Sequence, residues 1–295
     1  MNVTPAERRI RAMLPLVRLM QRHPPLRLAN RYMQKRTANL RPHKNVINRS
    51  ETIVGVRCQW LIPPDCPENR VLLYLHGGGF VFGLTPMHLK MAAGLALRMK
   101  TRILMPDYRL APEHPFPAAL NDSEKVYLWL LKQGIPAGNI VLAGDSAGGN
   151  LVLSLMMKCR DSGAALPAAA ALLSPAVKLG GGTSRPGFRD PLLPPKAMEF
   201  YTRAYVAEHD PRDPLISPLY GDLRGLPPLL IHAGEDEILR DEALQLAEKA
   251  RAAGTDAELE IFPRMWHVWQ LFPALPQTRQ SLDAIAGFLI SYTGD

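Results

Sequence analysis

Long apolar runs and cysteines are both scarce in this sequence of 295 residues. No stretch of about 18 consecutive apolar residues occurs, so the sequence predicts no transmembrane helix. The three cysteines (Cys58, Cys66 and Cys159) are too few for a disulfide scaffold, and no Cys-x-x-Cys pair or Cys/His cluster indicates a metal site. Because few cysteines are typical of a reducing compartment, we expect a cytoplasmic protein. We also expect no metal and no cofactor.

Acidic residues are nearly absent from the N-terminal part of the chain. Residues 1–50 hold 12 of the 35 Lys and Arg residues but only one of the 27 acidic residues. The rest of the chain therefore has 23 basic against 26 acidic residues. The excess positive charge of the chain, +8 in total, thus lies in the first 50 residues. Because this basic segment contains no recognised nucleic-acid-binding motif, we predict no nucleic-acid partner.

Residues 1–40 combine apolar residues at helical spacing with arginines between them. A Thr-Pro pair at residues 4–5 fits a helix N-terminus, and His-Pro-Pro at 23–25 separates a second helical segment that runs to about residue 39. No continuous apolar stretch follows the charges, so a secretory signal is not expected. We interpret the segment as a helical flap over the body; the alternatives are a transit peptide and a basic helix lying on an anionic membrane.

From about residue 46, short apolar runs alternate with helical patterns, after an antiparallel pair within 46–62. The predicted strands are 71–75, 102–105, 139–143, 168–173, 228–232 and 257–262, and the predicted helices are 86–99, 118–133, 147–160, 240–253 and 276–291. This alternation predicts an α/β fold, a mostly parallel sheet with helices on both faces. Residues 178–215, rich in Gly and Pro with one helix near 194–208, interrupt the pattern and are interpreted as an insertion.

In parallel sheets of this kind, ligands bind beyond the carboxyl ends of the strands. The run 139–143 is followed by Gly144-Asp145-Ser146-Ala147-Gly148, a G-x-S-x-G pattern between a predicted strand and a predicted helix. The small residues allow a sharp turn that exposes the serine at the sheet edge, with the helix dipole behind it. Ser146 is therefore a candidate nucleophile, and the alternative is a serine that only caps the helix.

The run 71–75 is followed by His76-Gly77-Gly78-Gly79-Phe80. Consecutive glycines let the backbone approach a ligand and turn its N–H groups inward, which suits an oxyanion hole. A phosphate-binding loop is the alternative, but neither G-x-x-x-x-G-K-[ST] nor G-x-G-x-x-G is present. Because His76 precedes the glycines at the strand end, we interpret it as a structural histidine and not as a base.

A serine nucleophile needs a histidine base, and His267 fits best because it follows the last predicted strand. His232 lies within a predicted buried strand and is assigned to the core. The acid that orients the histidine should follow the run 228–232, where three adjacent carboxylates occupy residues 235–237. Spacing alone does not choose between them, and Asp241 is a further candidate.

These segments together resemble the hormone-sensitive-lipase family of α/β hydrolases, in its bacterial carboxylesterase branch. Residues 76–79 are similar to the family's HGGG motif, residues 144–150 to its GDSAGGN motif, and residues 107–118 to a further hallmark stretch. Residues 236–239 resemble the acid loop, in which the family's Asp is catalytic. The resemblance runs from about residue 45 to the C-terminus.

The resemblance implies an α/β-hydrolase fold with a catalytic triad of Ser146, Asp236 and His267. It also implies an oxyanion hole built from three backbone N–H groups, those of Gly78, Gly79 and Ala147. A helical cap would consist of residues 1–44 and an insertion at about 178–215, on a catalytic domain of residues 45–295.

The predicted function is that of a serine carboxylesterase that hydrolyses short- to medium-chain acyl esters through an acyl-enzyme. The alternatives are a lactone hydrolase, a deacetylase or an amidase with the same triad, and a non-catalytic small-molecule receptor of this fold. Aromatic and apolar residues near the motifs are candidates for the substrate pocket: Phe80, Val81, Phe82, Trp266 and Trp269. We expect a small-molecule ester as partner, no stable membrane insertion, and a monomer or homodimer.

Overall fold

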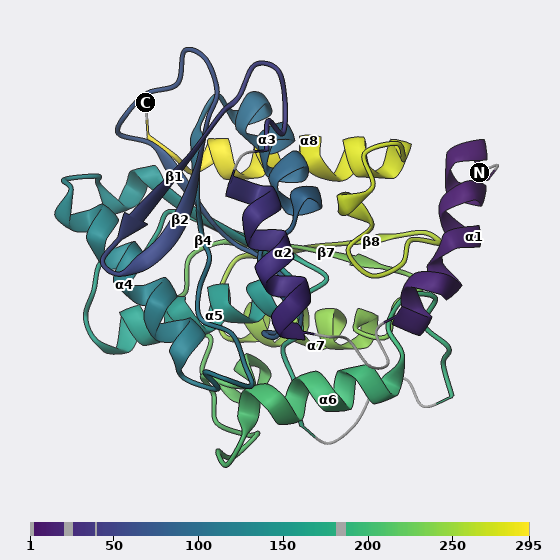
Figure 1. Ribbon diagram of the computed structural model, residues 1–295. Coiled ribbons are helices and arrows are strands. Elements are labelled where there is room, and N and C mark those ends of the chain that lie inside the picture. The colour runs from purple at the N-terminus through teal and green to yellow at the C-terminus, as the bar shows by residue number, and fades with distance from the viewer. Residues whose placement is uncertain (1–2, 21–25, 39, 181–186, 295) are drawn as a thin grey trace.

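The computed structural model describes residues 3–20, 26–38, 40–180 and 187–294. Within them an eight-stranded sheet has the strand order β1-β2-β4-β3-β5-β6-β7-β8 (Figure 1). β1 pairs antiparallel with β2 and β2 with β4, and all other neighbours are parallel, as predicted. The strands are β1 (Ile47–Ile53), β2 (Val56–Ile62), β3 (Val71–Leu75), β4 (Arg102–Pro106), β5 (Ile140–Asp145), β6 (Ala170–Leu173), β7 (Leu229–Gly234) and β8 (Ala257–Phe262).

Helices cover both faces of the sheet (Figure 1). α3 and α8 pack on one face, and α4, α5 and α7 pack on the other. The helices are α1 (Pro5–Met20), α2 (Leu26–Ala38), α3 (Pro86–Met99), α4 (Ala118–Lys132), α5 (Ala147–Asp161), α6 (Pro195–Val206), α7 (Arg240–Ala252) and α8 (Pro276–Ser291), with short 3₁₀ turns η1 (Ala137–Asn139), η2 (Pro218–Tyr220) and η3 (Trp269–Leu271). The part of the chain that the structure describes contains no helix long and apolar enough to cross a membrane.

Alternate residues of each central strand pack into opposite layers of the core. In β3, Leu73 and Leu75 contact the layer under α4 and α5, whereas Leu72 and Tyr74 contact the layer under α3 and α8. All β3 side chains are buried. Because successive side chains of a strand point to opposite faces and helices cover both faces here, such strands are apolar throughout. This packing explains the uninterrupted apolar runs that predicted the strands.

Four parallel strands end at the same edge of the sheet, where their following segments meet. These segments are residues 76–83 after β3, Ser146 after β5, residues 235–239 after β7 and residues 263–268 after β8. Each of them contains a residue that the sequence analysis selected for chemistry. The topology therefore places the candidate site at this edge.

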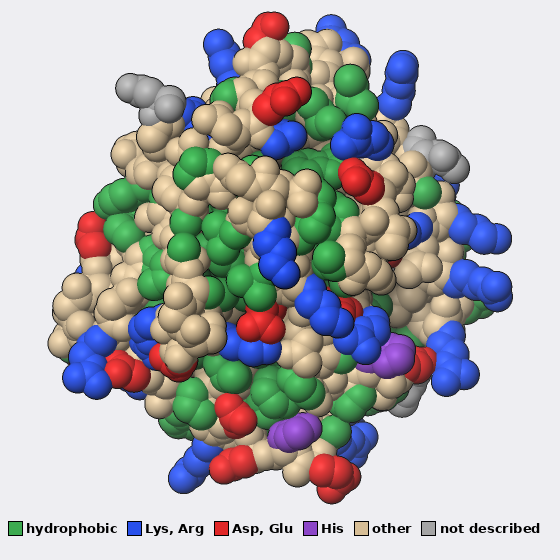
Figure 2. Space-filling model, turned by 90° about the vertical axis from the view of Figure 1, so that its left-hand side faces the viewer, with side chains coloured by type: hydrophobic (Ala, Val, Ile, Leu, Met, Phe, Trp, Pro, Cys, Tyr) green, Lys and Arg blue, Asp and Glu red, His purple; other side chains and the backbone are tan. Residues whose placement is uncertain are grey.

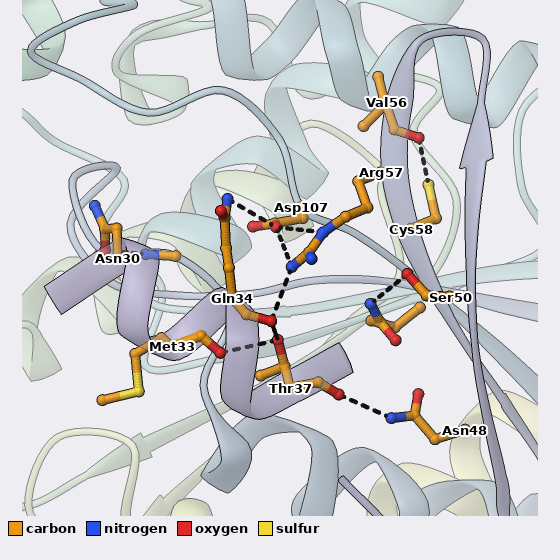
Figure 3. Close-up of polar contacts among 12 residues, drawn as sticks. Asn30, Met33, Gln34, Thr37, Asn48, Ser50, Val56, Arg57, Cys58 and Asp107 are labelled. Carbon is orange, nitrogen blue, oxygen red and sulfur yellow. Dashed lines mark hydrogen bonds and ion pairs between the residues drawn. The ribbon is translucent and has the colours of Figure 1, made fainter. Parts of the chain in front are cut away.

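The two N-terminal helices are attached to the body at different points. α1 begins at Pro5, as predicted, and the Glu7 N–H donates a hydrogen bond to Thr4 Oγ1 at 3.1 Å. α2 lies beside β1 and β2, where Asp107 accepts hydrogen bonds from Gln34 Nε2 at 3.3 Å and from Arg57 Nη2 at 2.9 Å (Figure 3). The predicted helix break at residues 23–25 lies outside the described residues.

Candidate active site

Ser146 stands at a sharp turn between β5 and α5. Its backbone has φ 52° and ψ −116°, a conformation that a non-glycine residue adopts only under strain. The surrounding structure holds it, since the Ser146 N–H donates to the Leu173 carbonyl at 2.8 Å. A Cβ atom on Gly148 would collide with the Leu75 carbonyl of β3, so strand and helix approach this closely only with glycine there. The G-x-S-x-G spacing therefore has the steric cause that the sequence analysis expected.

His267 lies between Ser146 and a carboxylate. Its Nε2 atom is 2.9 Å from Ser146 Oγ, and its Nδ1 atom is 2.9 Å from Glu237 Oε2. Glu237 is fully buried, and only 5% of His267 is exposed. A second hydrogen bond fixes the carboxylate, because the Gly234 N–H donates to Glu237 Oε1 at 2.8 Å. Serine, imidazole and carboxylate thus form a continuous hydrogen-bonded chain with the geometry of a nucleophile, a base and an orienting acid.

The expectation that Asp236 contacts His267 is wrong. Asp236 points away from the imidazole, keeps 35% of its side chain exposed and accepts a hydrogen bond from Arg11 Nη2 at 3.1 Å. Of the two carboxylates, only that of Glu237 is buried. Spacing along the chain did not distinguish the three adjacent carboxylates, and Ile238, which follows Glu237, is buried as well.

The environment of His267 favours its protonated form. Burial alone would lower the pKa of this imidazole, but the hydrogen bond and the negative charge of Glu237 outweigh burial and hold the pKa above its usual value of 6.5. An imidazole stabilised as a cation is suited to accept a proton from the serine hydroxyl.

The glycine loop after β3 and the start of α5 bring three backbone N–H groups to the cavity of Ser146. Gly78, Gly79 and Ala147 line the same cavity as Ser146, and none of their N–H groups donates to an acceptor among the described residues. Gly79 has φ 60°, and a Cβ atom there would lie 2.7 Å from the ring of Tyr201. Free N–H groups around a nucleophile can receive a negatively charged oxygen, as the resemblance implied.

A buried carboxylate connects the glycine loop to the serine turn. Asp145 accepts hydrogen bonds from the Gly77 N–H at 2.9 Å and from the Tyr74 hydroxyl at 2.7 Å, and His88 Nε2 lies 3.4 Å away. Burial alone would raise the pKa of Asp145, but the charge of His88 and these hydrogen bonds hold it below its usual value. Asp145 thus stays ionised and fixes the relative positions of the two loops.

His76 has the structural role predicted for it. Its ring is fully buried and stacks on the ring of Tyr108 with centroids 4.3 Å apart, and the Tyr108 hydroxyl donates to the His76 carbonyl at 2.6 Å. Burial lowers the pKa of His76 to about 4, so its ring is neutral at pH 7. The side chain does not line the cavity that contains Ser146.

The cavity above Ser146 has a volume of about 310 Å³ and mostly apolar walls. Phe80 and Phe82 line it, as predicted. The expectation is wrong for Val81, Trp266 and Trp269, which are fully buried elsewhere. The two tryptophans belong to an apolar cluster with Leu14 of α1. Trp266 directly precedes His267, yet it packs in this cluster while His267 lines the cavity.

Several wall residues were missed by the sequence analysis. Leu271 and Phe272 follow His267 closely, and the others come from segments distant in sequence from the motifs, namely Val17 of α1, Leu179, and Met198 and Tyr201 of α6. The predicted helix near 194–208 carried a usable signal, because Met198, Tyr201 and Thr202 share one helical face at spacings of three and four. That this face covers Ser146 depends on tertiary packing, which the sequence pattern does not report.

α1 is attached to the two loops that follow β7 and β8. The buried carboxylate of Glu7 accepts hydrogen bonds from Arg11 Nε at 3.1 Å and from Arg264 Nη2 at 3.0 Å. Arg11 Nη2 also donates to Asp236 and to the Arg264 carbonyl, and its guanidinium lies 5.3 Å from the ring centroid of Trp266. Arg11 therefore connects the loop of the acid to the loop of the histidine.

α2 contacts the third loop of the site. Asn30 Nδ2 donates to the Val81 carbonyl at 2.8 Å, and the Gly83 N–H donates to Asn30 Oδ1 at 3.0 Å. One amide thus holds both sides of the chain that follows the three glycines. Among the residues described, no group of three or more His, Cys, Asp or Glu side chains could hold a metal ion.

Comparison with known proteins agrees with this fold. Residues 72–271 match a family described as having the alpha/beta hydrolase fold. An acetyl-hydrolase of Streptomyces hygroscopicus is 40% identical over 248 residues, which cover 83% of this chain and 83% of the relative. An esterase of Acinetobacter venetianus is 33% identical over 269 residues, which cover 90% of this chain and 86% of the relative.

Solved structures extend the similarity to the whole chain. The crystal structure of an esterase from the bacterial hormone-sensitive lipase family has a TM-score of 0.90 and 36% identity, with complete coverage of both chains. A structure of the esterase EstE5 soaked with p-nitrophenyl butyrate has a TM-score of 0.88 and 34% identity, and covers 98% of this chain and 99% of that one. The chain therefore belongs to the hormone-sensitive-lipase family of α/β-hydrolase carboxylesterases.

Proposed function

We propose that this carboxylester hydrolase acts as a serine esterase on short- to medium-chain acyl esters, with Ser146, His267 and Glu237 as its triad. The observation that carries the proposal is the hydrogen-bonded chain from Ser146 through His267 to Glu237, which opens into an apolar cavity. The triad differs from the predicted one in its acid alone.

In the acylation step, His267 Nε2 takes the proton of Ser146 while Oγ attacks the ester carbonyl carbon. Glu237 holds the Nδ1–H tautomer and stabilises the imidazolium that forms. The negative charge on the former carbonyl oxygen is received by the N–H groups of Gly78, Gly79 and Ala147. When the intermediate collapses, His267 gives its proton to the departing alcohol, and an acyl group remains on Ser146.

In the deacylation step, a water molecule takes the place of the alcohol. His267 removes a proton from this water as its oxygen attacks the acyl carbon, and the same N–H groups receive the second oxyanion. The intermediate then releases the carboxylic acid, and His267 returns the proton to Ser146. The residues end in their starting protonation states.

The size of the cavity supports short to medium acyl chains. A volume of about 310 Å³ is at the lower end of ligand cavities, which span roughly 300–1,000 Å³. The name of the Streptomyces relative, an acetyl-hydrolase, agrees with a small acyl group. Lactone hydrolysis, deacetylation and amide hydrolysis use the same residues and remain the alternative reactions.

Two further expectations stay predictions. They are the absence of a nucleic-acid partner and a monomeric or homodimeric state.

We also propose that residues 1–44 and the insertion at about 178–215 form a cap on the catalytic domain of residues 45–295. Supporting this, Val17 of α1 and Met198 of α6 line the cavity together with Ser146. Both N-terminal helices contact loops of the site through side chains, Arg11 from α1 and Asn30 from α2.

The proposal is tested with p-nitrophenyl acetate, butyrate, octanoate and palmitate, each assayed with the wild type and with Ser146→Ala. We expect the wild-type rate to peak at a short or medium chain, and Ser146→Ala to lower kcat by a factor on the order of 10⁶. Thermal unfolding serves as the control, because Ser146→Ala should leave the fold intact. If Ser146→Ala hydrolysed every one of these esters as fast as the wild type, the proposal would be overturned.

A further inference from the structure

A second cavity of about 550 Å³ adjoins the cavity of Ser146 along α6. Its walls are formed by one face of α6, by residues 178–180, and by the segment just after Glu237. Apolar side chains make up much of its interior, among them Val206, Ile238 and Leu239, which are nearly fully buried. Exposed charged side chains also line it, among them Glu199 and Arg203.

The two cavities share three wall residues, Leu179, Met198 and Thr202. These three side chains border both cavities where the cavities meet, and we call them the partition. Met198 and Thr202 are one turn apart on the same face of α6. Of the three, Met198 is unbranched with three rotatable side-chain bonds, and such a side chain adapts to a ligand more readily than leucine or threonine.

The carboxyl of Glu242, which lines the second cavity, does not prevent an apolar ligand from binding there. The backbone N–H groups of Val177 and Lys178 donate to its Oε2 atom at 3.3 and 3.2 Å. Burial raises the pKa of Glu242 to about 8, so this group is mostly uncharged at neutral pH. The carboxyl of Glu242 therefore adds little charge beside the buried apolar walls, and the charged side chains that line the cavity are the half-buried Lys178 and the exposed Glu199 and Arg203.

We propose that the second cavity binds the distal part of longer acyl chains, and that Met198 is the side chain that limits their entry. An acyl group on Ser146 would fill the catalytic cavity first, and a longer chain would continue past Met198 into the apolar space beyond. This inference rests on the proposed esterase function, because it assigns the second cavity to the same substrate. Met198 is thus a specificity-determining residue for chain length.

The test compares Met198→Ala with Met87→Ala, and the readout is the ratio of kcat/KM for p-nitrophenyl dodecanoate to kcat/KM for p-nitrophenyl butyrate. Met87 is the matched control because it lines the catalytic cavity and does not line the second one. We expect Met198→Ala to raise the ratio about tenfold or more, the effect of burying roughly two additional methylene groups. Met87→Ala should change the ratio much less.

Two further variants keep the test decisive. Thr202→Ala removes less side-chain volume from the partition than Met198→Ala does, and it should also raise the ratio. In the Met198→Ala background, Val206→Phe fills the second cavity and should reverse the gain, with thermal unfolding showing that the double variant is folded.

An unchanged ratio in folded Met198→Ala and Thr202→Ala, or an equal rise in Met87→Ala, would overturn the inference about Met198. Butyrate hydrolysis that depends on Ser146 would still uphold the esterase function in that case. A butyrate rate independent of Ser146 would contradict the proposed function itself, so the two failures are distinguishable.

Discussion

Asp236 and Glu237 are adjacent carboxylates with different surroundings. Glu237 is fully buried, hydrogen-bonded to His267 Nδ1 and to the Gly234 N–H. Asp236 is partly exposed and paired with Arg11 at 3.1 Å. A buried carboxylate beside an imidazole orients and stabilises its cation, whereas a partly exposed ion pair contributes only modestly to stability. The two residues therefore give a direct comparison of roles at neighbouring positions.

Glu237→Gln should lower kcat by a factor on the order of 10²–10⁴, whereas Asp236→Asn should lower it only a few-fold. The Gln amide can keep the hydrogen bond with Gly234 and then presents an N–H to His267, which favours the wrong tautomer. Steady-state kinetics on p-nitrophenyl butyrate would measure both effects. A larger loss in Asp236→Asn than in Glu237→Gln would contradict the assignment of the acid.

The pH dependence of the reaction should follow the raised pKa of His267. Only the neutral imidazole accepts the Ser146 proton, so kcat/KM should fall on the acid side with a midpoint above 6.5, the usual value for histidine. Glu237→Gln removes the charge that raises this pKa, so its acid limb should move to lower pH. An acid limb at the same pH in both proteins would show that Glu237 does not control His267.

The same pKa shift has a defined sign for stability. A pKa that is higher in the folded than in the unfolded state contributes stability below the unfolded value, and this contribution disappears as the pH rises through the folded value. Protonation of His267 therefore stabilises the fold on the acid side of 6.5 while it stops catalysis.

At the scale of elements, α1 acts on the site through the loops that it joins. Arg11 contacts the buried Glu7, the Asp236 carboxylate and the Arg264 carbonyl. Breaking hydrogen bonds to charged groups costs about 1–3 kcal/mol, and the loops concerned carry the acid and the base of the triad. The helix therefore has a path to catalysis although none of its charged groups touches Ser146.

Arg11→Met should lower the thermal unfolding temperature. It should also lower kcat by about tenfold and change KM less, because misplacing catalytic groups by about 1 Å can lower a rate by more than tenfold. Arg11→Lys should restore part of both quantities. Arg9, exposed on the same helix, provides the control variant Arg9→Met, which should leave them unchanged. A lower unfolding temperature with an unchanged kcat would show that the contact is structural only.

Strands and helices could be predicted well from local patterns, and their contacts could not. The run at 71–75 is apolar because β3 is covered on both faces, and that signal is contained in five consecutive residues. The contact of Trp266 with α1 joins positions more than 250 residues apart in the chain, so no local sequence pattern predicts it. For the same reason Trp266 and Trp269 were expected in the pocket and are found in the cluster beneath α1.

At the scale of the whole molecule, charge distribution helps to place the N-terminal helices. The first 50 residues are strongly basic and the remaining chain is slightly acidic. Ion pairs join the two parts, Arg11 with Asp236 and Arg27 with Glu113. On the face shown in Figure 2, Lys and Arg side chains are interspersed with Asp and Glu. The net charge of +8 thus includes arginines that attach α1 and α2 to the body.

The identity of the catalytic serine and its partners is the central claim, and covalent trapping tests it most directly. A p-nitrophenyl alkylphosphonate forms a stable ester with a serine nucleophile, and peptide mass spectrometry locates the adduct. The account predicts a single adduct on Ser146 with stoichiometric release of p-nitrophenol, no adduct in Ser146→Ala, and trapping that is slower in Glu237→Gln but not in Asp236→Asn. An adduct on another residue, or undiminished labelling of Ser146→Ala, would contradict it.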